Sequence, residues 1–453
     1  MRGGRRCLCG LVRVMSDRVV ASGGGTGALF ADFRLLVFLF IGLRLMLAMV
    51  YQPYTLERYD AEGLYGPVER GLTTFGDFGY YFQLARLSDD GALPFRDYWL
   101  EFPPVSPTLF VGLYKLLALR GPVDYSAWAT ALGLLLLLVD AGNLLMLHRL
   151  GRILHGEQTA LSIAWVYALL AAPLIFMWWA FEALVAFALL SALLALLRGR
   201  LTCSAGAVIG GMLTKYVPVL IVPAVWRFYP WRQAVRYTLI ILVAVVIALA
   251  LLVTWSGELG LASLTAQFNK ASYQSVWALI DGNYRTGNFI SPEMRYDPAT
   301  ARHPLGNPPV IPAWARLIPF AAFGGYVFVR PMRRDAQRVV AFVSLTIVLF
   351  FLWAQGWSPQ WNVTLVPLIL LNFPTRNGVL ACLLLGGVSF LEYPVLFMHT
   401  GETGGEIAGA LLLPYVAAIL MRTGLLIGVA AALYRRLTEP PGGAMRAAQQ
   451  DSQ

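Results

Sequence analysis

Acidic and aromatic side chains gather in one polar segment, residues 76–104, which lies between long apolar stretches. It reads GDFGYYFQLARLSDDGALPFRDYWLEFPP. Carboxylates such as Asp77, Asp97 and Glu101 are the groups that remove a proton from an attacking hydroxyl. Acids, aromatic rings and prolines are too dense in this segment for a simple connector. We therefore expect the chemistry of this protein there.

The composition places that segment in a membrane protein. Of 453 residues, 58% are hydrophobic and 13% charged, and the mean hydropathy is +0.63. So little polar surface cannot cover a soluble globule of this length. Apolar stretches of about 20 residues, long enough to cross the hydrocarbon core as helices, recur along the chain. The sequence predicts an all-α polytopic membrane protein with about 10–12 transmembrane helices and interfacial helices in its first outer loop.

The expected transmembrane helices satisfy the positive-inside rule. With the N-terminus inside, the connections that carry paired or clustered arginines all lie on the cytoplasmic side. The expected helices cover residues 33–51, 125–147, 158–178, 180–198, 235–255, 311–329, 338–355, 361–373, 377–396 and 407–434.

This topology divides the chain into three parts. Residues 1–32 form a basic, disordered cytoplasmic tail, residues 33–436 the membrane domain, and residues 437–453 a second cytoplasmic tail. Two long polar loops, 52–124 and 256–310, then face the outside. We expect a multi-pass protein of the inner or plasma membrane, with its site on the extracytoplasmic side.

Two segments do not fit this topology as simple spans. Residues 105–119 must lie as a helix in the outer interface, and residues 203–226 must enter and leave from one side or cross in two short pieces. The second expectation has local support, because Lys215 within lipid needs water or a counter-charge and Pro218 breaks a helix.

Charge and cysteine content exclude other classes. The net charge of +10 comes from arginines divided among short loops, which form no continuous face for nucleic acid. The four cysteines suggest neither a disulfide framework nor a zinc site. Two large outer loops also differ from a transporter, whose substrate groups sit on broken helices at the midplane.

Short motifs follow one another in a recognisable order. They are Asp77-Phe-Gly-Tyr-Tyr, Gly91-Ala-Leu-Pro-Phe-Arg-Asp-Tyr-Trp-Leu-Glu-Phe-Pro-Pro104, Leu213-Thr-Lys-Tyr-Val-Pro218, Tyr273-Gln-Ser275 and Ser358-Pro-Gln-Trp361. The ordered set resembles the GT-C superfamily of glycosyltransferases, and most of all the family 87 bacterial mannosyltransferases that use polyprenyl-phosphate-mannose. The resemblance spans roughly residues 33–400, and the order of the motifs carries it more than any one motif.

The resemblance implies a GT-C type helical bundle and a donor sugar, mannose, linked through phosphate to a polyprenol. It also implies a direct displacement at the anomeric carbon with inversion. The phosphate leaves readily, whereas the attacking hydroxyl must lose a proton, so one carboxylate suffices as base. The resemblance assigns that role to Asp77, whose structural alternative is a helix N-cap. Because residues 52–76 lengthen the loop relative to the family, Asp60 is the second choice.

Acceptor or sugar binding is assigned to Tyr81, Asp97, Glu101 and Gln360. For Asp97 and Glu101 the alternative is a hydrogen-bonded corner, in which Arg96 pairs with an acid before the Phe-Pro-Pro turn.

Gln360 lies between two tryptophans, Trp357 and Trp361. An amide there can bind sugar hydroxyls. We expect the tryptophans themselves to belong to the aromatic belt at the membrane surface.

The leaving phosphate needs cations in a partly shielded site. Lys215 is the first candidate, and its alternative is a pair with Asp140 or Glu182. Arg285 and His303 in the second outer loop are further candidates, whose alternative is simple solvation.

No cofactor is expected beyond the lipid-phosphate sugar, which serves as substrate. A divalent ion held by Asp77, Asp97 and Glu101 is disfavoured, since no His joins these acids. The expected partners are membrane lipids, a polyprenyl-phosphate-sugar and a lipid or glycan acceptor, without nucleic acid. The alternatives are a lipid-linked glycan ligase or polymerase and a lipid or glycan flippase.

Overall fold

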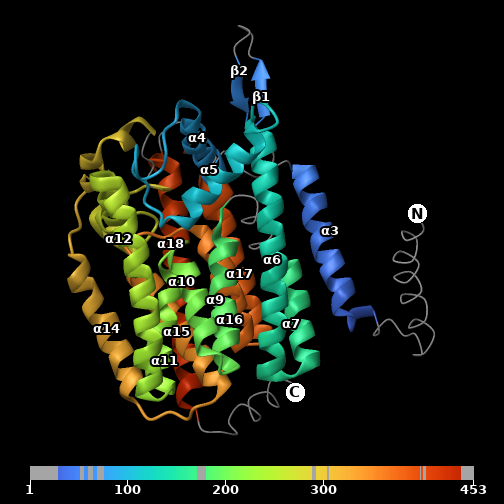
Figure 1. Cartoon of the computed structure of the whole chain (residues 1–453). Helices are drawn as coiled ribbons and strands as arrows, with labels where there is room; N and C mark the ends of the chain where they lie inside the picture. Colours follow the sequence, from blue (N-terminus) through green and yellow to red (C-terminus); the bar gives the residue numbers. More distant parts are fainter. Residues whose placement is uncertain are drawn as a thin grey trace, which may run out of the picture.

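Long helices standing side by side make up most of the computed structural model (Figure 1). It describes residues 29–51, 56–59, 65–68, 76–170, 180–287, 292–303, 306–397, 399–400 and 405–439. Asp60, the second candidate base, lies outside the described residues, as do most of the two predicted tails.

Helices form nearly all of the regular structure in the described residues. In chain order they are α3 (Phe33–Tyr51), α4 (Gly76–Arg86), α5 (Val105–Ala118), α6 (Tyr125–His155), α7 (Glu157–Leu169), α9 (Glu182–Leu197), α10 (Leu201–Met212), α11 (Val222–Phe228), α12 (Trp231–Asn269), α13 (Val276–Asp281), α14 (Ala313–Val329), α15 (Ala336–Trp353), α16 (Asn362–Asn372), α17 (Arg376–Phe390) and α18 (Leu412–Thr438). Short helical turns also occur, among them η2 (Val217–Ile221), η3 (Pro292–Tyr296), η4 (Pro298–Arg302) and η5 (Pro359–Trp361). Strands β1 (Leu56–Tyr59) and β2 (Tyr65–Val68) pair antiparallel, which is the one departure from an all-α chain among the described residues.

The chain is a helical polytopic membrane protein. Five helices among the described residues are long and apolar enough to cross a membrane: Tyr125–His155, Trp231–Asn269, Ala336–Trp353, Arg376–Leu396 and Gly409–Thr438. Other predicted spans form shorter apolar helices, such as α9 and α14. The prediction of about 10–12 transmembrane helices compares with these five long helices and five shorter apolar helices among the described residues.

The segment 203–226, expected either to enter and leave from one side or to cross in two short pieces, consists of short helical pieces separated by a turn. Helix α10 packs against α9, ends before Lys215, and is followed by η2 and α11. Figure 1 shows α11 at the end of the bundle opposite α4 and α5. The turn is tight, because a Cβ at Gly211 would lie 2.6 Å from Pro218 Cγ and 2.8 Å from Ala188 Cβ. This close approach positions the Lys215 turn.

Helices α4 and α5 lie across the same end of the bundle as that turn. The backbone N–H of Val105 donates to the carbonyl of Leu213 at 2.8 Å, which ties the start of α5 to the turn. In α12, Gly257 has φ 60° and breaks the helix, a conformation that residues with a Cβ adopt at a cost. The last part of α12 thus changes direction, and α12 packs against η4.

Gly211→Ala tests the close approach behind Lys215. We expect it to destabilise the protein by about 1–3 kcal/mol, because the added methyl group overpacks the contact with Pro218. Thermal unfolding in detergent measures the effect.

The matched control is Gly210→Ala on the same helix. A Cβ there meets no atom within 4 Å, so its melting temperature should equal or exceed that of the wild type. Equal melting temperatures for the two variants would contradict the proposed packing.

Candidate active site

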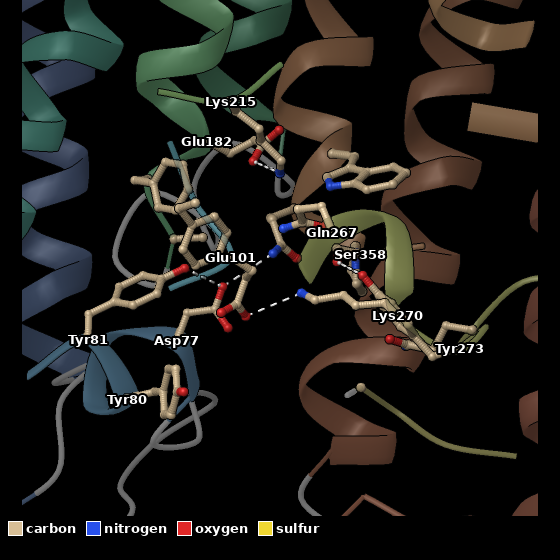
Figure 2. Close-up of a pocket in the computed structure, with 18 of the residues that line it drawn as sticks. Asp77, Tyr80, Tyr81, Glu101, Glu182, Lys215, Gln267, Lys270, Tyr273 and Ser358 are labelled. Atoms are coloured by element: carbon tan, nitrogen blue, oxygen red, sulfur yellow. Dashed lines mark hydrogen bonds and ion pairs between the residues drawn. The ribbon is translucent and has the colours of Figure 1, made fainter. Parts of the chain in front are cut away.

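A polar cavity of about 130 Å³ opens beneath α4, between the segments whose motifs predicted a site. Figure 2 shows Asp77, Tyr80 and Tyr81 on one wall, Lys270 and Tyr273 on the facing wall, and Lys215 with Glu182 at one end. Its lining residues are Asp77, Tyr80, Tyr81, Glu101, Phe102, Ala180, Phe181, Glu182, Lys215, Gln267, Lys270, Tyr273, Gln274, Thr286, Gly287, Arg295, Ser358, Pro359, Gln360, Trp361 and Phe397.

Asp77 lies in the first turn of α4 and accepts two side-chain hydrogen bonds. The Tyr81 hydroxyl donates to Oδ2 at 3.1 Å, and the Gln360 amide Nε2 donates to the same atom at 3.3 Å. Burial raises the pKa of Asp77 to about 6, against the Tyr81 hydrogen bond and the charge of Lys215, which lower it. The group is therefore a stronger base than an ordinary carboxylate and is still mainly ionised at neutral pH.

Packing holds Tyr81 in place. Its ring stacks on Phe110 with centroids 4.3 Å apart, and Phe102 meets it edge-on at 5.8 Å. Tyr81 is one turn after Asp77 on the same helix face, so the two side chains meet. The motif spacing Asp-Phe-Gly-Tyr-Tyr thereby creates an oriented carboxylate.

Lys215 has a carboxylate partner at the edge of the cavity. Its Nζ lies 2.7 Å from Glu182 Oε2, at the first residue of α9. The side chain of Lys215 is also 5.4 Å from the Trp361 ring. The structural alternative of a Glu182 pair is thus present, and the ammonium keeps further donors for another anion.

Glu101 joins two cations from distant parts of the chain. Its Oε1 lies 3.2 Å from Lys270 Nζ, and its Oε2 lies 2.7 Å from Arg295 Nη1. Burial opposes ionisation of Glu101, but these two charges outweigh it and hold its pKa well below the usual range. Glu101 is therefore a fixed anion that positions Lys270 at the cavity.

Gln274 contributes an amide donor to the cavity. The side chain is 1% exposed, and its Nε2 makes no hydrogen bond within the described residues. Its φ of 46° is unusual for a residue with a Cβ. Arg422 donates to its carbonyl, and its N–H donates to the Tyr415 hydroxyl at 3.2 Å. These contacts hold the amide at the cavity, where it can donate to a hydroxyl of a substrate.

A second, apolar cavity of about 340 Å³ adjoins the polar one. The residues on the walls of both are Glu101, Phe102, Lys215, Gln267, Lys270, Tyr273 and Trp361. Its remaining wall comes mainly from α14, α15 and the segment after α15. A polar reaction site thus opens directly into an apolar one.

Three predicted residues lie elsewhere. Asp97 is at the surface, where Arg96 pairs with it at 2.7 Å and lowers its pKa, as in the alternative of a hydrogen-bonded corner. Backbone hydrogen bonds tie Arg285 to Tyr415, and His303 is an exposed residue after η4. None of the three lines either cavity.

The expectation of an aromatic belt was wrong for both tryptophans. Trp357 is 2% exposed and donates to Glu392 Oε2 at 3.2 Å, and Trp361 lines both cavities. The turn η5 buries them because it packs inside the bundle, with the Phe351 ring 4.6 Å from that of Trp361. The same turn brings Gln360 to Asp77.

Sequence reasoning missed Lys270, Arg295 and the role of Gln274. Lys270 precedes the Tyr273-Gln-Ser275 motif by three residues, and this proximity was a usable signal. For Arg295 the sequence holds no such signal, since nothing in a loop with several arginines indicates which one reaches Glu101. In the described part of the chain, no group of three or more His, Cys, Asp or Glu side chains could hold a metal ion.

Comparison with protein-family models and with curated protein sequences gives no match. Among solved structures, the chain is similar to the apo oligosaccharyltransferase of Archaeoglobus fulgidus, at 12% identity, 90% coverage of this chain, 56% of that chain and a TM-score of 0.40. It is also similar to ArnT from Cupriavidus metallidurans bound to undecaprenyl phosphate, at 16% identity, 89% of this chain, 76% of that chain and a TM-score of 0.42. The chain spans just over half the length of the archaeal protein. At these TM-scores the likeness does not fix the fold, and the interpretation rests on the chain's own residues.

Asp77→Asn should raise stability at neutral pH. The folded protein holds Asp77 with a pKa of about 6, above its ordinary 3.8, so ionising it costs the folded state up to about 3 kcal/mol. Below pH 3.8 the carboxyl is protonated in both the folded and the unfolded state, so it costs the folded protein nothing. As the pH rises through 6, the carboxyl ionises in the folded protein, and the wild type loses this stability. The gain in the variant should therefore grow between these pH values, as measured by thermal unfolding.

Asp97→Asn is the matched control, because Arg96 lowers the pKa of Asp97. It should leave stability unchanged or reduce it at neutral pH. A lower melting temperature for Asp77→Asn than for the wild type at about pH 7.5 would contradict the buried, raised-pKa carboxylate.

Proposed function

We propose that this protein is a membrane glycosyltransferase of the GT-C type. It moves a hexose, mannose, from a polyprenyl-phosphate donor to a hydroxyl of a lipid or glycan acceptor, on the extracytoplasmic side of the cell membrane. The observation that carries the proposal is the buried Asp77 carboxylate, oriented by Tyr81 and Gln360 in a cavity that also holds Lys215 and Lys270. Mannose and the GT-C assignment rest on the sequence resemblance.

Asp77 acts as general base in this proposal. Its Oδ2 is held by Tyr81 and Gln360, so we assign Oδ1 to the acceptor hydroxyl. The hydroxyl oxygen bonds to the anomeric carbon as its proton passes to Asp77. The bond from that carbon to the phosphate oxygen breaks, and the bonding electrons leave with the polyprenyl phosphate. Attack opposite to the leaving group inverts the anomeric configuration.

The leaving phosphate gains negative charge in this step, and ammonium groups stabilise it. Lys215 remains the first choice, and Lys270 joins it on the wall shared by the two cavities. Arg285 and His303 drop out of the proposal, because they line neither cavity. The acceptor and sugar hydroxyls are assigned to Gln360 and Gln274.

The apolar cavity supports a lipid donor. It continues into a groove of about 540 Å³ between α14 and α15, with Phe350 and Trp353 on the walls of both. Apolar side chains line almost all of that groove, including Leu317 and Phe320 of α14. A prenyl chain gains free energy by leaving water along such a surface, whereas a free sugar nucleotide has no group that needs it.

Transfer from a defined donor tests the proposal. Purified wild-type protein in nanodiscs receives radiolabelled polyprenyl-phosphate-mannose and a membrane lipid extract, beside Asp77→Asn. We expect transfer by the wild type and a loss of at least about a hundredfold in the variant, because a general base contributes about that much. Asp90→Asn, an exposed acid nearby on the chain, is the control and should transfer normally.

The alternatives give other outcomes in the same assay. Transfer only from a diphosphate-linked glycan would favour a ligase or polymerase. Movement of the lipid across the bilayer without transfer, equal in wild type and variant, would favour a flippase.

The pH dependence tests the base itself. Since Asp77 must be ionised, kcat/KM should rise with pH through about 6 and then level off. Tyr81→Phe keeps the ring but removes a hydrogen bond to the carboxylate, so the rising limb should move to higher pH. An unchanged midpoint, or one shifted to lower pH, would argue against Asp77 as the titrating base.

A further inference from the structure

Arg316 is a buried arginine whose charge is not paired with any described carboxylate. Its side chain is 3% exposed, and its Nε and Nη1 make no hydrogen bond within the described residues. None of the ion pairs found in that part of the chain includes it. Burying a guanidinium without a counter-charge is costly, so its position indicates an anionic ligand.

The local structure fixes Arg316 at the apolar cavity. It lies in the first turn of α14, where the helix dipole also favours an anion. Its guanidinium lies over the Trp277 ring, 5.3 Å from the centroid. The Trp353 indole donates to the Ala313 carbonyl at 3.1 Å, which attaches this end of α14 to α15.

The one described carboxylate within electrostatic range of Arg316 is already engaged. Asp281 acts on it through space only, because no ion pair joins them within 4.0 Å. The Ser272 hydroxyl donates to Asp281 Oδ2 at 2.6 Å, and the Val310 N–H donates to Oδ1 at 2.8 Å. Asp281 therefore stabilises the segments around Ser272 and Val310, and it does not account for the burial of Arg316.

We propose that Arg316 binds the phosphate of a lipid, together with Lys270 on the wall between the two cavities. The proposal rests on the proposed function, and it adds a phosphate ligand that the sequence did not indicate. The phosphate then sits at the mouth of the apolar cavity, and its prenyl chain follows α14 past Leu317 and Phe320. The sugar projects into the polar cavity toward Asp77.

The charges on the walls suit a single phosphate. Among the described residues, four cations line the two cavities, namely Lys215, Lys270, Arg295 and Arg316, against the three carboxylates of Asp77, Glu101 and Glu182. The excess is one positive charge. A sugar linked to a lipid through one phosphate carries one negative charge and neutralises it, whereas a diphosphate linkage adds a second charge that these walls do not balance.

Binding of undecaprenyl phosphate to the full-length protein in detergent tests this assignment without requiring catalysis. Neutral undecaprenol and inorganic phosphate are the comparison ligands. We expect the wild type to prefer undecaprenyl phosphate over undecaprenol, and Arg316→Gln to lose about tenfold or more of its affinity for the phosphate lipid. Affinity for undecaprenol should not change.

Two variants control for charge and folding. Arg302→Gln removes an exposed arginine on η4 and should bind as the wild type does. Arg316→Lys keeps the charge and should retain more affinity than Arg316→Gln. Since no described carboxylate pairs with Arg316, Arg316→Gln should melt no lower than the wild type, and a clearly lower melting temperature would show a structural role and overturn the assignment.

The outcomes separate this inference from the proposed function. Undiminished binding by Arg316→Gln, with mannose transfer intact in the wild type, overturns the inference alone. Lipid binding that depends on Arg316, without any transfer of mannose by the wild type, supports the lipid-phosphate site and contradicts the proposed glycosyltransferase activity. Displacement of the lipid by millimolar inorganic phosphate would identify a site for free phosphate and overturn the lipid assignment.

Discussion

The buried carboxylate of Glu101 holds the candidate site together. It pairs with Lys270 after α12 and with Arg295 in η3, so it joins segments almost two hundred residues apart. The backbone strengthens the second connection, since the Trp99 N–H donates to the Arg295 carbonyl at 2.9 Å and Arg295 Nη1 donates back to the Trp99 carbonyl at 3.2 Å. Loss of Glu101 would leave two buried cations without their carboxylate, and breaking a buried ion pair by removing one side typically costs about 3–5 kcal/mol.

This arrangement explains why Asp77 and Glu101 behave differently in one cavity. Glu101 has two cationic partners in direct contact, and its pKa is held low. Asp77 has neutral donors, Tyr81 and Gln360, and its pKa is raised by burial to about 6. Two carboxylates with separated pKa values can serve separate roles, one as a fixed anion and the other as a proton acceptor.

The sequence predicted the parts of the site that are local and missed those that depend on tertiary contacts. Asp77 and Tyr81 are one helical turn apart, so their contact follows from spacing, and the break around Lys215 follows from a charge and a proline in an apolar stretch. The partners of Glu101 come from remote loops, and only the folded chain selects Arg295 among the loop arginines. The ends of some helices were missed: α6 and α12 continue past the expected ends at residues 147 and 255, because hydropathy marks the apolar stretch and not the polar turns that continue a helix.

In the proposed displacement, negative charge moves across the cavity while the total charge of the site stays constant. Asp77 loses its charge on taking the proton, and the phosphate gains one as the sugar leaves. Cations beside Asp77 would therefore stabilise the state before the reaction, whereas cations beside the phosphate stabilise the state after it. The side-chain hydrogen bonds to Asp77 come from neutral donors, and Lys215, Lys270 and Arg316 line the side that leads to the apolar cavity. The distribution of charge, and not the number of charged groups, is what favours transfer in this direction.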